Sequence, residues 1–292
     1  MTLPAIIPQA EPPARVEAET DRQLVETWVA RHESRHTQRN YRRQAERFLA
    51  VTGRTLREVR VSDVQAFLAS LDGQASATRA NAASAIKSLL SFAYDLGYAP
   101  FNAGKAVKAP SIKNTLAERI MPEADTLLMI RMEPCLRNRA LLTLAYGGGL
   151  RISEVCGLRW RDLAERDGGA GQATVYGKGG KTRVILLSAG TWKVLAMLRG
   201  KAIEDDPLFR SQKGGALDPS TVHRVVKAAA ARAGLSPDVS AHWLRHAHAS
   251  HSLDRGAPIH LVQATLGHAS VATTGRYTHA RPSDSSARYL GV

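Results

Sequence analysis

The chain has 292 residues, which suggests one large or two ordinary domains, and 44% of them are hydrophobic, so real cores can form. Its 40 lysines and arginines outnumber 26 aspartates and glutamates, and the net charge of +14 favours an anionic partner. Two cysteines exclude a disulfide framework, and the sequence predicts neither a membrane span nor a secretory signal.

The first third of the chain predicts a flexible leader followed by a helical bundle. Residues 1–20 contain four prolines and several charges, which is typical of a flexible leader. Residues 21–101 have apolar residues at helical spacing, as in Val64, Phe67, Leu68 and Leu71. We expect four helices that form a small domain.

Two local patterns predict helix ends in this bundle. Ser62 and Gln65 have the spacing of a capping box, which places a helix start at Ser62. Gly97 follows an apolar helical pattern and is a candidate C-cap.

Arginines in this region predict a basic stripe. Arg39, Arg43 and Arg47 are four residues apart and share one helix face, and Arg79 and Lys87 can add to it from a later helix. A solvated face that binds nothing is the alternative, and the acidic Glu46 lies among these arginines. The stripe is therefore a candidate surface for the anionic partner that the net charge favours.

Residues 102–120 interrupt the helical pattern and predict a basic linker. The segment contains Gly104, Pro110 and the lysines Lys105, Lys108 and Lys113. A new domain is expected over residues 121–282, and Pro122 suits the first turn of its first helix.

The second domain predicts helices around a small hairpin. Residues 138–147 indicate a helix, which ends at the three glycines 147–149. Another helix is expected to begin near Arg151. Residues 173–176 and 182–186 read as two strands joined by a turn over residues 177–181. Helices are expected from there onward, so the fold class is mainly α with a small β-hairpin.

Residues suited to phosphodiester chemistry are scattered through this second domain. Residues 111–292 carry a net charge of +10, against +4 for residues 1–110. Arginine donates in a fork that fits phosphate, and Arg151 follows three glycines where a backbone can approach a ligand. Arg245 shares a helix face with His242, three residues earlier. Lys178 lies at the tip of the hairpin, and Tyr277 is a candidate nucleophile.

These motifs, in this order, resemble the tyrosine recombinases, the family of phage integrases and bacterial Xer proteins. The resemblance covers about residues 20–282. It rests on Gly-Leu-Arg-Ile-Ser-Glu at 149–154, Gly-Lys-Gly at 177–179, His-Trp-Leu-Arg-His at 242–246, and Leu-Gly-His at 266–268 followed by Tyr277.

The resemblance implies a role for each matching residue. Arg151 and Arg245 would clamp the scissile phosphate, and Lys178, favoured over Lys181, would protonate the leaving 5′-oxygen. His242 would be an acid/base group, and His268 would form a hydrogen bond to the phosphate. Glu154 would orient the site, and Tyr277 would be the nucleophile. The other histidines His246, His248, His251 and His279 are interpreted as structural or exposed. Tyr289 in the tail is a rival nucleophile, and Gly275 is expected to loosen the helix before Tyr277.

The residues argue against two other types of site. A nucleotide-binding P-loop at Gly180-Lys181-Thr182 needs a glycine five residues before Gly180, where Val175 stands. A zinc site at His242 and His246 lacks the glutamate of a metalloprotease helix, because Trp243 occupies that position. We therefore expect no metal and no cofactor.

The resemblance implies a two-domain, C-shaped DNA clamp that cuts and rejoins strands at a defined site. It implies that double-stranded DNA is contacted by the basic stripe and the linker, that is, by Arg39, Arg43, Arg47, Arg79, Lys87, Lys105 and Lys108. A 3′-phosphotyrosyl intermediate and a Holliday junction would form within a homo- or hetero-tetramer. The tail at residues 283–292 would pack into a neighbouring subunit, and a disordered tail is the alternative. The alternatives are relaxation of DNA in the manner of a type IB topoisomerase, or a catalytically silent DNA-binding regulator. A cytoplasmic, nucleoid-associated protein without membrane contact is expected.

Overall fold

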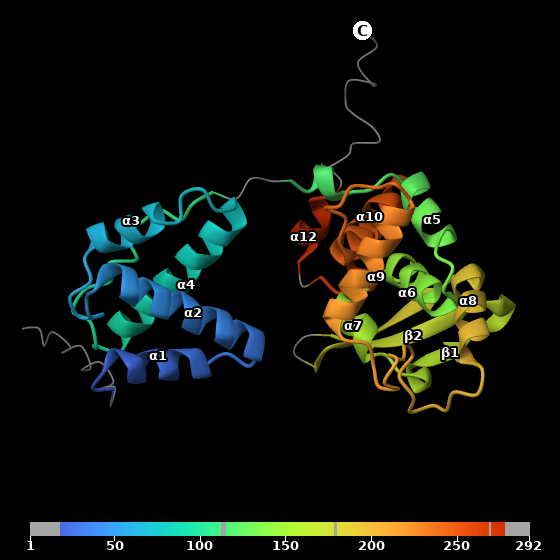
Figure 1. Cartoon of the computed structure of the whole chain (residues 1–292), viewed down its shortest axis with the longest axis horizontal. Coiled ribbons are helices and arrows are strands. Elements are labelled where there is room, and N and C mark those ends of the chain that lie inside the picture. The colour runs from blue at the N-terminus through green and yellow to red at the C-terminus, as the bar shows by residue number, and fades with distance from the viewer. Residues whose placement is uncertain (1–17, 112–114, 178–179, 269, 278–292) are drawn as a thin grey trace, which may run out of the picture. The chain divides into compact units, whose positions relative to one another are not determined.

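The computed structural model describes residues 18–111, 115–177, 180–268 and 270–277. The chain divides between Lys113 and Asn114 into two compact units (Figure 1). The division falls inside the segment predicted as a linker. The described residues of the first unit are helical, and those of the second combine helices with a small antiparallel sheet, so the predicted fold class is confirmed.

The described part of the first unit contains the four predicted helices. They are α1 (Asp21–Ala30), α2 (Arg35–Thr52), α3 (Val61–Ala69) and α4 (Ser76–Asp95). Their inward faces form one apolar core, in which the largest fully buried side chains include Trp28, Phe48, Phe67, Ile86 and Leu89. The helical spacing of apolar residues therefore predicted both the elements and the core.

The start of α3 corrects one sequence prediction. The helix begins at Val61, one residue before Ser62, and the carboxylate of Asp63 accepts a hydrogen bond of 2.9 Å from the backbone N–H of Arg60. Asp63 rather than Gln65 therefore satisfies a donor at the helix start. The end of α4 lies close to its prediction: Leu96 is the C-cap, and Gly97, one residue later, has the left-handed conformation with a φ of +68°.

The predicted linker segment packs at both of its ends. Ala103 and Val107 are buried in the core of the first unit. Leu116 and Ile120 are buried in a small core of the second unit, on either side of the short helix η1 (Ala117–Arg119). Much of the segment thus belongs to one unit or the other, although its composition indicates a linker.

The second unit places helices around a three-stranded sheet. Its helices are α5 (Glu123–Arg131), α6 (Leu136–Gly147), α7 (Ile152–Gly157), η2 (Trp160–Asp162), η3 (Asp167–Gly169), α8 (Ala189–Arg199), α9 (Pro219–Arg232), α10 (Ala241–Asp254), α11 (Ile259–Leu266) and α12 (Val271–Gly275). Its strands are β1 (Leu163–Glu165), β2 (Gly171–Tyr176) and β3 (Thr182–Leu187).

The strand order is β1-β2-β3, and both pairs are antiparallel. The hairpin of β2 and β3 confirms the prediction, whereas β1 was missed because three residues carry too little periodicity. Val175 and Ile185 point into the core, while Val184 and Leu186 are exposed, as a strand with one buried face requires.

Helix packing brings distant segments of the second unit together. Helix α6 packs against α8 and α10, and α11 packs against both α10 and β3. The start of α7, the middle of α10 and the end of α11 therefore lie close in space, and each carries a residue of the predicted site.

Candidate active site

Arg151 is positioned by the glycines between α6 and α7. Gly149 has a φ of +58°, and an added Cβ would lie 2.7 Å from His248 and 2.8 Å from Leu266, so only glycine fits. Arg151 follows as the N-cap of α7, with its side chain 36% exposed. One arm of its guanidinium donates to Glu154 at 2.9 Å, and the other donates to the carbonyl of Gly267 at 3.3 Å.

Glu154 is a buried carboxylate held between two arginines. It accepts a further hydrogen bond from the backbone N–H of Arg151, and both arms of Arg183 donate to it at 2.9 and 2.8 Å. Burial by itself would raise the pKa of Glu154, but the hydrogen bonds from Arg183 and Arg151 outweigh it and lower the pKa to about 2. The predicted orienting partner of Arg151 therefore lies beside it as an ionised group.

Arg183 is a site residue that the sequence analysis missed. It lies on β3, and besides its pair with Glu154 it donates from Nε to the carbonyl of Thr265 at 2.7 Å. The strand pattern contained a signal, because Arg183 alternates onto the same face as Ile185 and Leu187, which are buried. An arginine on the inward face of a strand requires a buried partner.

Arg245 lies on α10 and is almost fully buried. Its two arms donate to the carbonyls of Gly149 at 2.6 Å and Leu266 at 2.7 Å. Burial, followed by repulsion from Arg151, lowers its pKa to about 10, so the guanidinium stays charged at neutral pH. Because Arg151 binds the next carbonyl, that of Gly267, both arginines converge on the end of α11.

His268 lies directly after this helix end. Gly267 ends α11 at a φ of +64°, and an added Cβ would lie 3.1 Å from Arg183. Nδ1 of His268 is 2.9 Å from the hydroxyl of Thr274. Burial, with repulsion from Arg245 and Arg151, lowers the pKa of His268 to about 4, so the ring is neutral near pH 7.

A cleft of about 1000 Å³ opens beside these groups. Its lining includes Arg151, Glu154, Arg183, Gly267 and His268. Lys181 also lines the cleft, and its side chain is exposed. The cleft thus joins α7, β3 and the end of α11, and its cationic lining suits an anionic ligand.

Lys178 lies outside the described residues. The adjoining Gly177 donates from its backbone N–H to the carbonyl of Lys181 at 2.7 Å, which joins the two strands of the predicted hairpin. The preference for Lys178 over Lys181 as a proton donor stays a prediction.

Tyr277 is buried just beyond α12. Gly275 is the last residue of that helix, so it ends the helix rather than loosening its middle. The Tyr277 ring stacks with that of His268 at a centroid distance of 6.5 Å. Burial raises the pKa of the phenol, and Arg245 and Arg276 partly offset the rise.

The hydroxyl of Tyr277 contacts His246 rather than His242. Nδ1 of His246 lies 2.7 Å from the phenolic oxygen. His242 is exposed on the same helix, with its ring centre 6.5 Å from that of His246. We expected His246 to be structural or exposed. The spacing of four residues from His242 was the available signal, because it places both rings on one helix face.

Two further histidines of α10, the half-buried His248 and the buried His251, contact backbone carbonyls. Nδ1 of His248 lies 2.8 Å from the carbonyl of Tyr146, and Nε2 of His251 lies 3.0 Å from that of Met121. Within the described ranges, no group of three or more His, Cys, Asp and Glu side chains could hold a metal ion, and no helix could cross a membrane. His279 and Tyr289 lie outside those ranges.

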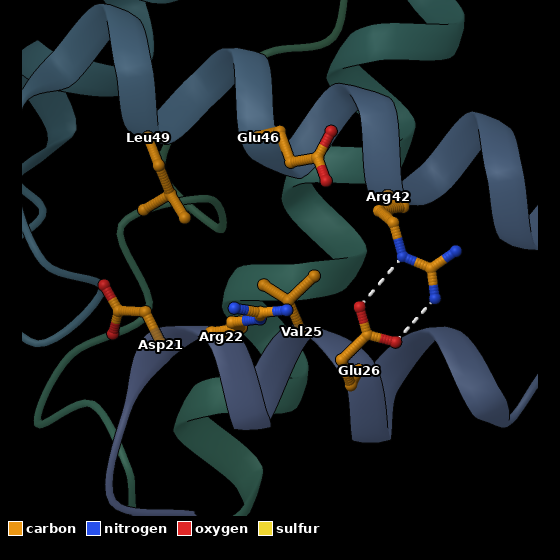
Figure 2. Close-up of a pocket in the computed structure, with 7 residues that line it drawn as sticks. All are labelled: Asp21, Arg22, Val25, Glu26, Arg42, Glu46 and Leu49. Carbon is orange, nitrogen blue, oxygen red and sulfur yellow. Dashed lines mark hydrogen bonds and ion pairs between the residues drawn. The ribbon is translucent and has the colours of Figure 1, made fainter.

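The predicted basic stripe lies partly on the surface of α2. Arg39 and Arg43 are exposed, and Arg47 is half-buried. Glu46 and Arg42 line a groove beside α1 (Figure 2). Glu46 is three residues from Arg43, so the carboxylate borders the stripe.

The remaining predicted DNA-binding residues differ in how far they are engaged. Arg79 pairs with Asp72 at 2.7 Å, and the Lys87 ammonium donates to the carbonyl of Val107. Lys105 and Lys108 are exposed. Of these four residues, the two of the linker segment have the freer side chains.

Comparison with known proteins identifies relatives for both units. Residues 112–284 match the phage integrase family, and residues 24–97 match the N-terminal SAM-like domain of phage integrases. The tyrosine recombinase XerC of Rhodospirillum centenum is 37% identical over 270 residues, which cover 84% of this chain and 77% of the relative. The tyrosine recombinase XerD of Corynebacterium glutamicum is 32% identical over 290 residues, which cover 88% of this chain and 93% of the relative.

Solved structures share the fold. The XerH site-specific recombinase bound to difH substrate in a pre-cleavage complex matches with a TM-score of 0.73 and 24% identity, over 94% of this chain and 84% of that one. A lambda integrase tetramer bound to a Holliday junction matches with a TM-score of 0.73 and 19% identity, over 92% of this chain and 80% of that one.

Proposed function

This chain belongs to the phage integrase family as a tyrosine site-specific recombinase, and from that premise we propose how its residues cut and rejoin DNA. The phenolic oxygen of Tyr277 attacks the scissile phosphorus, which forms a 3′-phosphotyrosyl bond and releases a 5′-hydroxyl. A 5′-hydroxyl of the partner strand then attacks that bond and restores a phosphodiester. Each step exchanges one phosphate ester for another, so neither ATP nor another cofactor enters the scheme.

The convergence of Arg151 and Arg245 on the end of α11 is the observation that carries this proposal. The two guanidiniums reach adjacent carbonyls from different helices, beside a cleft that His268 also lines. Attack adds negative charge to the non-bridging oxygens, and fixed guanidiniums stabilise that charge without reorganising. His268, which is neutral, would donate a hydrogen bond to the same phosphate.

The leaving group and the nucleophile need separate help. An alkoxide leaves poorly near neutral pH, so a placed proton donor accelerates the step by roughly 10²–10⁴-fold, and we assign that role to Lys178. His242 is proposed as a further acid/base group of the site. Glu154 and Arg183 would act by fixing the position of Arg151.

The wider assembly is inferred from the relatives. Double-stranded DNA would bind the exposed arginines of α2 and the linker lysines Lys105 and Lys108 mainly through phosphates. Four protomers would exchange strands through a Holliday junction, with residues 283–292 of each, outside the described ranges, packed into a neighbour. The domain limits at residues 21–101 and 121–282 and a cytoplasmic, nucleoid-associated location belong to the same proposal.

Covalent trapping tests this function directly. The full chain is incubated with nicked suicide duplexes that carry random sequence, and denaturing gels reveal any protein–DNA adduct. We expect an adduct with the natural chain and none with Tyr277→Phe, since the variant lacks only the attacking oxygen. An adduct that persists in the variant would show that another residue is the nucleophile.

Sequencing the trapped DNA separates the two cleaving enzyme classes. A shared sequence in the trapped duplexes is expected of a site-specific recombinase. Trapping without sequence preference would favour relaxation in the manner of a topoisomerase. DNA binding without any adduct would favour a catalytically silent regulator.

A further inference from the structure

The hydrogen bond between His246 and Tyr277 has no role in the proposed chemistry so far. Nδ1 of His246 lies 2.7 Å from the phenolic oxygen, the atom that must attack phosphorus. The two rings are tilted by 45°, with centroids 5.7 Å apart, and Tyr277 is buried. A phenol must lose its proton when it forms a phosphate ester, so a proton acceptor in contact with that oxygen has direct chemical meaning.

The charge state of His246 suits an acceptor. Burial, followed by repulsion from His242 and then Arg119, lowers the pKa of His246 to about 4. The ring is therefore neutral near pH 7, and one of its nitrogens carries a free lone pair. Burial also raises the pKa of Tyr277, so the phenol keeps its proton and can donate it to that lone pair.

We propose, on the basis of the recombinase function above, that His246 is a catalytic residue that receives the proton of Tyr277. The phenolic oxygen forms a bond to phosphorus, its proton passes to Nδ1 of His246, and the bond from phosphorus to the 5′-oxygen breaks. The leaving oxygen takes a proton from the separate acid assigned to Lys178. In the reverse step, the imidazolium of His246 returns its proton to Tyr277.

The charges around His246 link this proton transfer to bound DNA. Basic groups face it from three elements: the arginine Arg245 and the titratable His242 on α10, Arg119 on η1, and Arg276 after α12. They disfavour an imidazolium while the cleft holds no anion. A phosphate between the arginines, which gains negative charge during attack, would offset this repulsion and favour protonation of His246.

The tautomer of His246 gives a test that needs no DNA. Nitrogen NMR on the full chain labelled with ¹⁵N-histidine distinguishes a ring protonated at Nε2 from one protonated at Nδ1. We expect the proton on Nε2 at pH 7, which leaves Nδ1 to accept from Tyr277. A proton on Nδ1 would make His246 the donor and overturn the proposal.

Cleavage kinetics give the second test, on a duplex recovered from the trapping pool. His246→Asn keeps an acceptor atom near the position of Nδ1 but cannot take up a proton, and His246→Ala removes both. We expect adduct formation to slow by about 100-fold or more in each variant, because a positioned base contributes roughly 10²–10⁴-fold. His260→Ala, which alters an exposed histidine on α11, is the matched control and should keep the natural rate.

A substrate with a sulfur-bridged 5′ leaving group isolates the nucleophile. A thiolate leaves without a proton donor, so this substrate should restore cleavage by Lys178→Ala but not by His246→Ala.

The pH dependence of cleavage gives a further test. The cleavage rate of the natural chain should be nearly flat from pH 6 to 9, whereas that of His246→Asn should rise about tenfold per pH unit, because only the phenolate then attacks. Added imidazole should partly restore His246→Ala.

The outcomes separate the two proposals. No adduct from the natural chain would count against the proposed function itself. A natural adduct together with an unchanged rate in His246→Asn would reject proton transfer to His246 and leave the function standing. A faster rate in either His246 variant would show that the histidine restrains Tyr277, which also overturns the proposal.

Discussion

Arginine side chains do different work in the two units. In the first unit, Arg42 pairs with Glu26 at the surface, where the side chains are 37% and 51% exposed. In the second, Arg183 pairs with Glu154, where they are 14% and 3% exposed. A surface pair contributes roughly 0–1 kcal/mol, whereas breaking a buried pair costs about 3–5 kcal/mol. The difference shows that an ion pair holds the geometry of a site when it is buried, and that opposite charges alone are not sufficient.

Replacing one carboxylate in each pair should give the largest effect. Glu154→Gln keeps the shape of the side chain but leaves Arg151 and Arg183 without a negative partner, so the free energy of unfolding should fall by about 3–5 kcal/mol. Glu26→Gln, the matched change in the bundle, should cost less than about 1 kcal/mol. Urea unfolding of the full chains, monitored by circular dichroism, measures both losses of stability. Equal losses would remove the distinction between the two pairs.

Low pH should weaken the buried pair of Glu154 and Arg183. The pKa of Glu154 falls from an ordinary 4.5 to about 2, so its stabilisation is fully present above pH 4.5 and is lost as pH falls toward 2. The shift corresponds to about 3 kcal/mol on the scale of 1.36 kcal/mol per pKa unit. Unfolding measured from pH 6 to 2 should show this loss in the natural chain and a smaller loss in Glu154→Gln. Parallel curves for the two chains would contradict it.

Arg183→Lys tests geometry at constant charge. Lysine cannot reproduce the fork that holds Glu154 or the hydrogen bond to Thr265, so Arg151 should lose part of its orientation. We expect adduct formation to slow by about tenfold, equivalent to about 1.4 kcal/mol in the barrier. DNA affinity, measured by fluorescence anisotropy, should stay within about twofold. A loss of affinity without a change in rate would place Arg183 in DNA binding instead.

The exposed arginines of α2 should give the smallest effects. Arg39→Ala and Arg43→Ala should each weaken DNA binding modestly and reduce the slope of log affinity against log salt by about 1, as expected for one lost phosphate contact. Arg42→Ala serves as the control, because the Arg42 side chain is already paired with Glu26 (Figure 2). An equal change in slope for Arg42→Ala would show that the salt dependence follows net charge rather than a stripe.

The sequence predicted elements and contacts to different degrees. Helical periodicity found the four helices of the bundle, and the glycine-rich turn found the β2–β3 hairpin, because both signals are local. The start of α3 was misplaced, because the side chains of Asp63 and Ser62 are both capable caps and periodicity does not choose between them. Strand β1 was missed because its three residues depend on pairing with β2 for their structure.

Motifs identified most of the candidate site but not its internal connections. Arg151, Glu154, Arg245 and His268 do gather around one cleft or helix end. The motif fragments could not show that Arg183 binds Glu154, since the two residues are 29 positions apart. Nor could spacing alone choose which histidine of α10 meets Tyr277, since that choice depends on where the chain returns after α12.

The burial of Tyr277 makes the proposed nucleophile part of a core as well. Its ring is one of six buried residues in a small cluster with Leu116, Ile120, Ala249, Val262 and Leu266. Removing an aromatic ring from such a place costs roughly 3–5 kcal/mol, so Tyr277→Ala would confound lost chemistry with lost folding. The side chain proposed to attack DNA is therefore also needed for packing. Natural variants that lose catalysis but keep the fold should carry phenylalanine at this position.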